Sequence, residues 1–451
     1  MQIIKNIYKK NKKNELIFSL VIFLLLIVIQ LPWINLNGIA VPDTQGYIDV
    51  SKYWFNSDAI YIRPIIYPIF IYLSNSYGTG LFGSIVYIQI IFYALSGTLF
   101  YNILTQQKIN INKILLISLV FVSFITPQAL HMNQIVLPEM LPLFFVLLLF
   151  YFLLKPSTLS TSFIISLLII IPILTKPLWL LLLSFPFIKF IYSNKTLNNF
   201  IYGLLIPITF SLSLYSINQY FVAKNNVNKI IASTFDVNTN LALIRMGLID
   251  GSESTKLYSY LYYNGLIPEI SNRYWNNIDS EYSNFTQLKN KIPWELKEDY
   301  NFWGDILLKN PNNLFKYFSF QISRIPIFFS TSAENGSVVF LFNYLNSIYQ
   351  RFFSNIHSKN IVGILFSIFA CIIGLFNFTK LTIHKLLFFL ILEFAIVLCL
   401  LTYQNSHFLR MRSVIEPLII YVVLYTFIKV TKYLNEKYKF NTIISYLSKQ
   451  T

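Results

Sequence analysis

Six charged side chains stand where apolar segments of this chain begin or end, the places at which a membrane-bound chain meets water. They are two acids and four bases: Asp43, Glu139, Arg63, Lys176, Arg410 and Arg412. A guanidinium group binds phosphate oxygens through two parallel hydrogen bonds, which an ammonium group cannot do. A carboxylate at the same boundary can meet a lipid head group. These residue types together favour a site for an anionic group carried by a lipid.

The first outer segment holds three of the candidates. Asp43 comes shortly after the first apolar run, and Tyr47 and Asp49 follow it closely. The alternative for Asp43 is structural, because aspartate is a favoured residue at the N-cap of a helix. Asp43 is the leading candidate of this segment, and Tyr47 and Asp49 are further candidates.

The other charged positions have structural alternatives too. Arg63 lies between apolar stretches, where a lone arginine either snorkels to the interface or binds an anion. Glu139 follows His131, a further candidate, in one outer turn, and an acid at the mouth of a span is costly unless it is solvated or paired. Arg410 and Arg412 precede the last apolar run, where basic residues commonly anchor a helix end.

The composition places these side chains in a membrane protein. Hydrophobic residues make up 55% of the 451 residues and charged residues only 12%, whereas soluble domains carry about 25% charged residues. The mean hydropathy is +0.57, and an aromatic content of 18% is the opposite of a disordered chain. Cys371 and Cys399 both lie in apolar runs, so no disulfide framework is expected. We expect an all-α polytopic membrane protein.

Apolar runs long enough to cross a bilayer, which needs about 17–25 residues, predict about ten transmembrane helices. The runs are 16–33, 82–103, 111–127, 137–154, 160–191, 200–220, 360–378, 385–403 and 413–430. The run 160–191 is either one long helix or a hairpin that turns at 175–177. Pro172, Pro177 and the cost of a lysine in mid-membrane favour the hairpin.

This topology separates the charges. With the basic N-terminal tail inside, nearly all of the net charge of +16 falls on short cytoplasmic segments as lysine, which satisfies the positive-inside rule. Every arginine falls on the outer side. The chain is therefore predicted to be a multi-pass plasma (inner) membrane protein with both termini in the cytoplasm and an extracytoplasmic active face.

The predicted topology divides the chain into three parts. Residues 1–220 form an N-terminal transmembrane module with the site-bearing outer loops, residues 221–358 an extracytoplasmic aromatic-rich segment, and residues 359–451 a C-terminal transmembrane module with a basic cytoplasmic tail. In the second part, residues 294–309 and 312–325 have the apolar faces of amphipathic helices that lie on a bilayer surface. The alternative for both is plain packing on the ends of the spans.

Other kinds of site have little support. The sequence has no glycine-rich phosphate loop, no Ser-His-Asp context and no His/Cys cluster with metal-ligand spacing. A transporter is expected to place its key charges near mid-bilayer, often in broken helices of two related halves. Glu393 is the one acid in such a position.

The order of the outer motifs resembles that of the integral-membrane glycosyltransferases of the GT-C superfamily, which include protein mannosyltransferases and lipid A aminoarabinose transferases. In that family an acid follows the first span as Asp-Ser/Thr-x-x-Tyr, which residues 43–47 match. Residues 63–68 are similar to an Arg-x-Pro-x-Tyr-Pro string, with the first proline displaced by one position, and Glu139 matches a recurrent glutamate. Lys176 with Pro177 resembles a Thr-Arg-Pro turn, and residues 410–417 resemble a late Arg-x-Arg-x-x-x-x-Pro motif.

The resemblance implies a GT-C-like fold and an inverting transfer of a sugar from a polyprenyl-phosphate donor. The acceptor would be a glycan, lipid or protein on the non-cytoplasmic side, and no nucleic acid is implied. Asp43 would act as general base on the acceptor hydroxyl, worth about 10²–10⁴-fold, with Glu139 as a second catalytic residue. The departing phosphate would be stabilised electrostatically by four cations: Arg63, Lys176, Arg410 and Arg412.

No cofactor follows with certainty from these motifs. Many members of the family carry paired acids in the first loop, whereas here the second acid, Asp49, lies six residues after Asp43. A divalent metal ion is therefore left open.

Two other functions are left open as well. A transporter or flippase of a lipid-linked or anionic solute would use the same cations for the head group and would depend on Glu393. A polysaccharide polymerase or ligase would use a lipid-diphosphate oligosaccharide donor and would need no early acid. Dependence on Asp43 separates the polymerase from the glycosyltransferase.

Overall fold

The described part of the chain is helical. The computed structural model describes residues 2–31, 38–40, 42–53, 64–74, 83–107, 109, 111–224, 311–330, 361–375, 380–401 and 412–438. Within these ranges no strand is present, and one isolated parallel bridge pairs Ile39 with Ile135. The expectation of an all-α fold is confirmed for these residues.

The helices of the N-terminal half follow one another closely. They are α1 (Gln2–Gln30), α2 (Pro42–Tyr53), α3 (Ile66–Leu73), α4 (Gly83–Gln106), α5 (Lys113–Phe124), α6 (Pro127–Met132), α7 (Leu141–Leu153), α8 (Leu159–Thr175), the 3₁₀ helix η2 (Pro177–Ser184), α9 (Phe185–Ile191), α10 (Leu197–Phe200), the π-helical turn η3 (Ile201–Leu205) and α11 (Ile206–Lys224). The later ones are α16 (Pro311–Ser323), α17 (Ile325–Ser330), α19 (Ile361–Ile372), α20 (Ile383–Leu401) and α22 (Glu416–Tyr438).

Three helical stretches are long and apolar enough to cross a membrane: Ser84–Gln106, Leu197–Ile217 and Glu416–Glu436. Shorter apolar helices accompany them, among them Glu15–Gln30, Leu141–Leu153 and Leu159–Thr175. Long apolar helices of this kind indicate a membrane protein. The number of ten spans stays a prediction.

The run 160–191 folds as the expected hairpin. Helix α8 ends at Thr175, and Lys176 has extended backbone angles (φ −156°, ψ 125°) before η2 begins at Pro177. At the far end, the Lys189 ammonium donates to the carbonyl of Lys155, 3.0 Å away, just before α8 starts. The segment after Lys176 therefore returns to the end of the bundle from which α8 departs.

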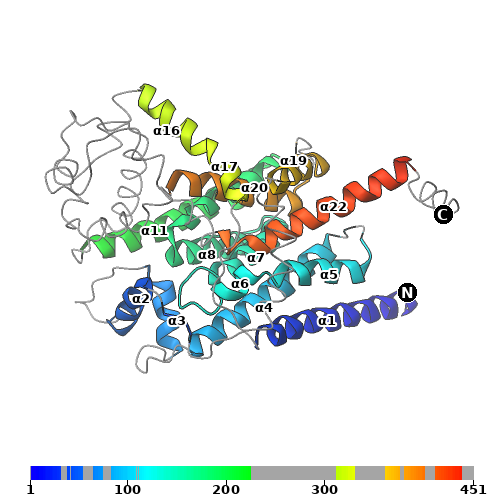
Figure 1. The fold of residues 1–451 in the computed structure, drawn as a ribbon, viewed down its shortest axis with the longest axis horizontal. Helices are drawn as coiled ribbons and strands as arrows, with labels where there is room; N and C mark the ends of the chain where they lie inside the picture. Colours follow the sequence, from blue (N-terminus) through cyan, green and yellow to red (C-terminus); the bar gives the residue numbers. More distant parts are fainter. Residues whose placement is uncertain are drawn as a thin grey trace, which may run out of the picture.

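The bundle has two distinct ends. Helices α2 and α3 lie at one end, on the left in Figure 1, whereas α1 begins and α22 ends at the other. Helix α16, drawn in yellow, projects from the bundle (Figure 1). It confirms a helix within residues 312–325; it buries Tyr317 and leaves Phe315 73% exposed. The helix expected at 294–309 lies outside the described residues.

Helices α1 and α4 meet at a glycine. A Cβ atom at Gly97 would overlap the side chain of Leu26 and would lie only 3.2 Å from the ring of Phe124. Leu26 and Phe124 are both fully buried, so neither has free space into which to move. Gly97 therefore allows the close approach of α1, α4 and α5.

We expect Gly97→Ala to lower the free energy of unfolding by about 1 kcal/mol. Overpacking costs about 1–3 kcal/mol, and the better helix propensity of alanine returns up to about 1 kcal/mol. Gly203→Ala is the matched control, because its Cβ would meet only the Ser157 hydroxyl, at 3.0 Å, which can rotate away. Thermal denaturation of the purified protein in detergent measures both; equal stability of the two variants contradicts the packing argument.

Candidate functional site

A buried glutamine organises the end of the bundle near α2 and α3. The Gln89 side-chain amide, on α4, donates to the carbonyls of Asn133 and Ile135, at 2.8 and 3.0 Å. Its oxygen accepts a hydrogen bond from the Tyr67 hydroxyl, at 2.6 Å. Both N–H groups are thus used on carbonyls, which can only accept, and this fixes the orientation of the amide. One side chain thereby ties α3, α4 and the turn after α6 together.

The same turn is held from α1. The Asn133 amide donates to the Gln30 side chain at 2.8 Å, and Gln30 donates to the carbonyl of Leu26 at 2.6 Å. The bridge between Ile39 and Ile135 adds two backbone hydrogen bonds: the Ile39 N–H donates to the Gln134 carbonyl and the Val136 N–H to the Ile39 carbonyl. The chain segment that leaves α1 is therefore fixed against the segment that leads to α7.

Helix α2 is attached to this frame through Thr44. The Thr44 hydroxyl donates to the carbonyl of Val136 at 3.0 Å and is buried. Asp43, its neighbour, is the second residue of α2 and so lies in the first turn rather than at the N-cap position. The first turn of a helix carries a partial positive charge that favours an acid. The Asp43 side chain lies outside the described residues.

Tyr47 and Tyr67 line the space between α2 and α3. Their rings meet edge to face with centroids 5.3 Å apart, and both side chains are buried. Burial, followed by the negative charge of Glu139, raises the pKa of Tyr67 well above its ordinary value. Tyr67 therefore stays protonated as a hydrogen-bond donor to Gln89, and Glu139 lies within electrostatic reach of it.

Glu139 and Lys176 form the ion pair of this site. Lys176 Nζ lies 2.9 Å from Glu139 Oε1, and the side chains are 19% and 1% exposed. Glu139 comes from the turn before α7, and Lys176 from the turn between α8 and η2. An acid and a base separated by 37 residues thus meet where Thr44 also attaches. We call Thr44, Tyr47, Tyr67, Glu139 and Lys176 the Glu139 cluster.

His131 and Asp49 are the two other candidates of this region. His131 lies on α6, and partial burial lowers the pKa of its imidazole, which is therefore neutral at pH 7. Asp49 is exposed on α2 and accepts a hydrogen bond from the Gln45 amide at 2.7 Å.

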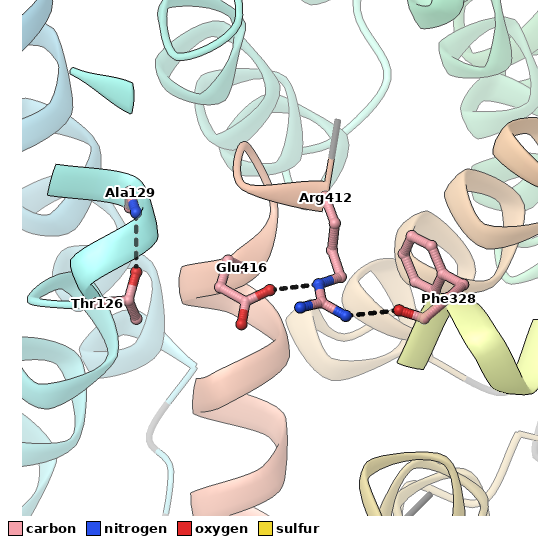
Figure 2. A network of polar contacts seen from close by, with 5 residues as sticks. All are labelled: Thr126, Ala129, Phe328, Arg412 and Glu416. Carbon is pink, nitrogen blue, oxygen red and sulfur yellow. Dashed lines mark hydrogen bonds and ion pairs between the residues drawn. The ribbon is translucent and has the colours of Figure 1, made fainter. Parts of the chain in front are cut away.

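Arg412 is held in a second polar contact, at the start of α22. Figure 2 shows its guanidinium group between Glu416 and the Phe328 backbone, with Thr126 and the first turn of α6 on the far side of Glu416. Arg412 Nε lies 2.7 Å from Glu416 Oε2, and Arg412 Nη1 donates to the Phe328 carbonyl at 2.6 Å. Both charged side chains are buried. Arg412 thereby joins α17 to α22, and phosphate binding by it stays a prediction.

No family model, characterised protein or solved structure matches this chain. We therefore infer the site from its geometry.

Of the residues expected at the site, the structure brings Tyr47, Glu139 and Lys176 together and places Asp43 on the helix beside them. Arg63 and Arg410 lie outside the described residues. Within the described part of the chain, no three His, Cys, Asp or Glu residues are grouped as a metal site would require.

Sequence reasoning missed the amides that hold the site. Gln30 and Gln89 are single polar residues near the ends of apolar runs, and a buried amide there needs hydrogen-bond partners. That signal marks them as structural polar residues, but it does not name the carbonyls that they reach. Glu416, four residues after Arg412, was open to prediction from helical spacing.

We expect Gln89→Leu to lower the free energy of unfolding by at least about 3 kcal/mol. The substitution removes the partners of two carbonyls and one hydroxyl, and each unsatisfied buried group costs about 1–3 kcal/mol. Gln45→Leu is the control, since Gln45 is exposed and its loss should change stability by less than about 0.5 kcal/mol. Thermal denaturation compares them; a small effect at Gln89 would mean that the turn is held by the other contacts alone.

We expect Lys176→Met to destabilise the protein by about 3 kcal/mol, because it leaves the buried Glu139 carboxylate without its ammonium partner. Lys432→Met is the control: its pair with Glu436 is 3.7 Å long and more than half exposed, so its loss should cost at most about 1 kcal/mol. The double variant Glu139→Gln/Lys176→Met should recover part of the loss. A strictly additive double-mutant cycle would show that the two side chains do not interact.

Proposed function

We propose that this chain is a membrane glycosyltransferase that moves a sugar from a polyprenyl-phosphate donor to an acceptor on the non-cytoplasmic face. One observation carries the proposal: the segment that bears Asp43, the turn that bears Glu139 and the turn that bears Lys176 are fixed together at one end of the bundle. An apolar helical bundle suits a lipid-borne donor, since the bilayer then brings the phosphate to the ends of the helices.

In this proposal Asp43 is the general base that takes the proton of the acceptor hydroxyl. It lies in the first turn of α2, where the helix dipole favours a negative charge. The hydrogen bond from Thr44 to Val136 fixes the register of that turn. The sugar carbon develops positive charge as the acceptor oxygen attacks from the face opposite the phosphate, and the configuration at that carbon is inverted.

Lys176 supplies positive charge for the departing phosphate. Its ammonium group has three donors, and its side chain is partly exposed while that of Glu139 is not. Glu139 holds the ammonium group in place. The cation is therefore already in position when a phosphate oxygen arrives. Arg63, Arg410 and Arg412 are proposed to add to this charge, and the aromatic-rich segment 221–358 to close over sugar and acceptor.

The proposed orientation places the Glu139 cluster outside the cell. The start of α1 and the end of α22, which carry the lysine-rich tails, lie at the opposite end of the bundle (Figure 1). Lysines gather on the cytoplasmic side of membrane proteins. These two facts support the proposal of a plasma-membrane protein with cytoplasmic termini and an extracytoplasmic site.

We expect Asp43→Asn to reduce sugar transfer by at least about 10²-fold, because an amide cannot accept the acceptor's proton. The measurement is mass spectrometry of cell-envelope glycans and lipids from cells that lack the protein and are complemented with each variant. Asp49→Asn is the matched control, since Asp49 lies on the same helix, is exposed and contacts Gln45.

Undiminished transfer by Asp43→Asn at equal protein level overturns the role of Asp43. Loss of transfer only in the Asp43 variant supports it. If the envelope is identical with and without the protein, the glycosyltransferase proposal itself fails.

A transporter of a lipid-linked or anionic solute is the second candidate. The observation in its favour is that Glu393, near the middle of α20, contacts Ser184 at the end of the 3₁₀ segment η2. An ionisable residue beside an interrupted helix is typical of transport sites. Movement of solute without a new glycosidic bond distinguishes this function from the first.

A further inference from the structure

A second group of cations gathers at the other end of the bundle from the Glu139 cluster. Lys155 lies before the start of α8, whereas Lys176 follows its end. The Lys189 ammonium, in the last turn of α9, donates to the carbonyl of Lys155 at 3.0 Å. Lys195 follows α9, and its ammonium donates to the carbonyl of Ile191 at 3.0 Å. We call Lys155, Lys189 and Lys195 the α9 lysines, because all three lie around the end of that helix.

Helix α20 brings a fourth lysine to the same place. The Lys385 ammonium lies 4.2 Å from the centre of the Tyr192 ring and donates to the carbonyl of Lys380 at 3.1 Å. Tyr192 is the C-cap residue of α9, and its hydroxyl donates to the carbonyl of Leu375 at 2.7 Å. Lys385 therefore adds positive charge beside the α9 lysines.

The described carboxylates do not balance the charge of the α9 lysines. The sequence contains no Asp or Glu between Glu139 and Asp236. The elements α7, η2 and η3 pack on α9, and all of them lie within this acid-free stretch. Among the described residues, the ammonium groups of the α9 lysines contact backbone carbonyls and aromatic rings. Positive charges that lie together without an acid attract an anion.

The α9 lysines also keep N–H donors for such an anion, since each ammonium group has three. The Lys155 ammonium lies 4.5 Å from the centre of the Tyr151 ring and donates no hydrogen bond to the described residues. Lys189 is buried and donates to one carbonyl. Lys155 is half-buried and Lys195 is exposed, so these two can reach a ligand. A phosphate oxygen accepts strong, charge-assisted hydrogen bonds from groups of this kind.

Exposed apolar side chains lie next to these cations. Ile191 on α9 is 45% exposed, and Leu197 and Phe200 on α10 are 71% and 43% exposed. The Phe200 ring packs against Phe190 with centroids 5.9 Å apart. The Lys195 ammonium lies 4.2 Å from the centre of that same Phe190 ring. Positive charge and exposed apolar surface thus adjoin, and an exposed apolar patch marks a place where a protein meets a partner or a membrane.

We propose that the α9 lysines bind the phosphate of an anionic phospholipid whose acyl chains lie on the exposed apolar side chains of α9 and α10. Lys155 and Lys195 donate to the phosphate oxygens, and buried Lys189 adds its charge. Basic sites between membrane helices bind anionic head groups in this way. A soluble phosphate would leave the apolar side chains uncovered, and a zwitterionic lipid would bring a positive charge of its own to the cations. In the proposed orientation this lipid belongs to the cytoplasmic leaflet.

Native mass spectrometry of the full-length protein in detergent measures the binding of single lipids. The wild type should bind dioleoyl phosphatidylglycerol more tightly than dioleoyl phosphatidylcholine, which has the same acyl chains. Lys155→Gln/Lys195→Gln should weaken phosphatidylglycerol binding by at least about 10-fold, because each lysine near an anionic membrane surface strengthens the attraction by about five-fold. Phosphatidylcholine binding should not change. Lys155→Arg/Lys195→Arg keeps both charges and should retain the binding.

Lys113→Gln/Lys432→Gln is the matched control, since it removes the same charge from exposed positions on α5 and α22. It should bind phosphatidylglycerol like the wild type. Equal affinity of the wild type for the two lipids, or equal phosphatidylglycerol affinity of the two glutamine variants, overturns the proposal.

Competition distinguishes a lipid from a free phosphate. Inorganic phosphate and glycerol 3-phosphate should fail to displace phosphatidylglycerol at equal concentration, because they make no apolar contact. Displacement by either would show a site for a soluble phosphate and would overturn the lipid assignment. Thermal denaturation checks that each variant is folded, and none of these measurements depends on whether the protein transfers sugar.

Discussion

The hydrogen bonds of the Gln89 amide are the constraint on which the site depends. The turn that follows α6 brings backbone carbonyls into the apolar interior, where water cannot satisfy them. Gln89 supplies donors to two of these carbonyls and takes the proton of Tyr67. With that turn fixed, Val136 can accept from Thr44, and Glu139, three residues later, reaches Lys176. The position of α2, and of Asp43 on it, therefore depends on the hydrogen bonds that the backbone of the turn after α6 receives.

Much of the fold was open to prediction because apolar length and proline placement are local properties. The hairpin at 175–177 followed from Pro172, Lys176 and Pro177, and the structure turns at Lys176 as expected. The topology predicted from the sequence placed Glu139 and Lys176 on the same side of the membrane. It did not predict that the two side chains form an ion pair. Which two side chains touch depends on the rotation of each helix, and a helix that is apolar on all sides gives little signal of its rotation.

The contacts of Gln89 were beyond prediction for a related reason. A glutamine in an apolar helix must find partners, yet the carbonyls of Asn133 and Ile135 lie more than forty residues away in the sequence. The pair of Arg412 and Glu416 was readable from its spacing of four residues. The hydrogen bond from Arg412 to the Phe328 carbonyl depends on how α17 packs against the start of α22. The spacing of residues along the chain does not predict that packing.

The two cations of the described chain that were expected at a phosphate differ in what phosphate binding would cost them. Arg412 is buried, and its guanidinium group already contacts Glu416 and the Phe328 carbonyl. A phosphate there would have to displace contacts that hold α17 to α22, and breaking a buried ion pair costs about 3–5 kcal/mol. Lys176 is partly exposed and joins two helical segments at a turn. It can approach a phosphate while it keeps its contact with Glu139, so the geometry favours Lys176 over Arg412 as the residue that would meet the phosphate of the proposed donor.

The 3₁₀ segment η2 gives Lys176 a position that a flexible turn would not. Its eight residues, at about 2 Å of rise each, span roughly 16 Å, with Lys176 at one end and the Ser184 contact to Glu393 at the other. A 3₁₀ helix has poorer hydrogen-bond geometry than an α-helix and is rarely this long without support. Its anchors are the ion pair of Lys176 with Glu139 and the contact of Ser184 with Glu393. The segment between these two contacts packs on α8 and α20, so its two ends, and Lys176 with them, are held in place along its whole length.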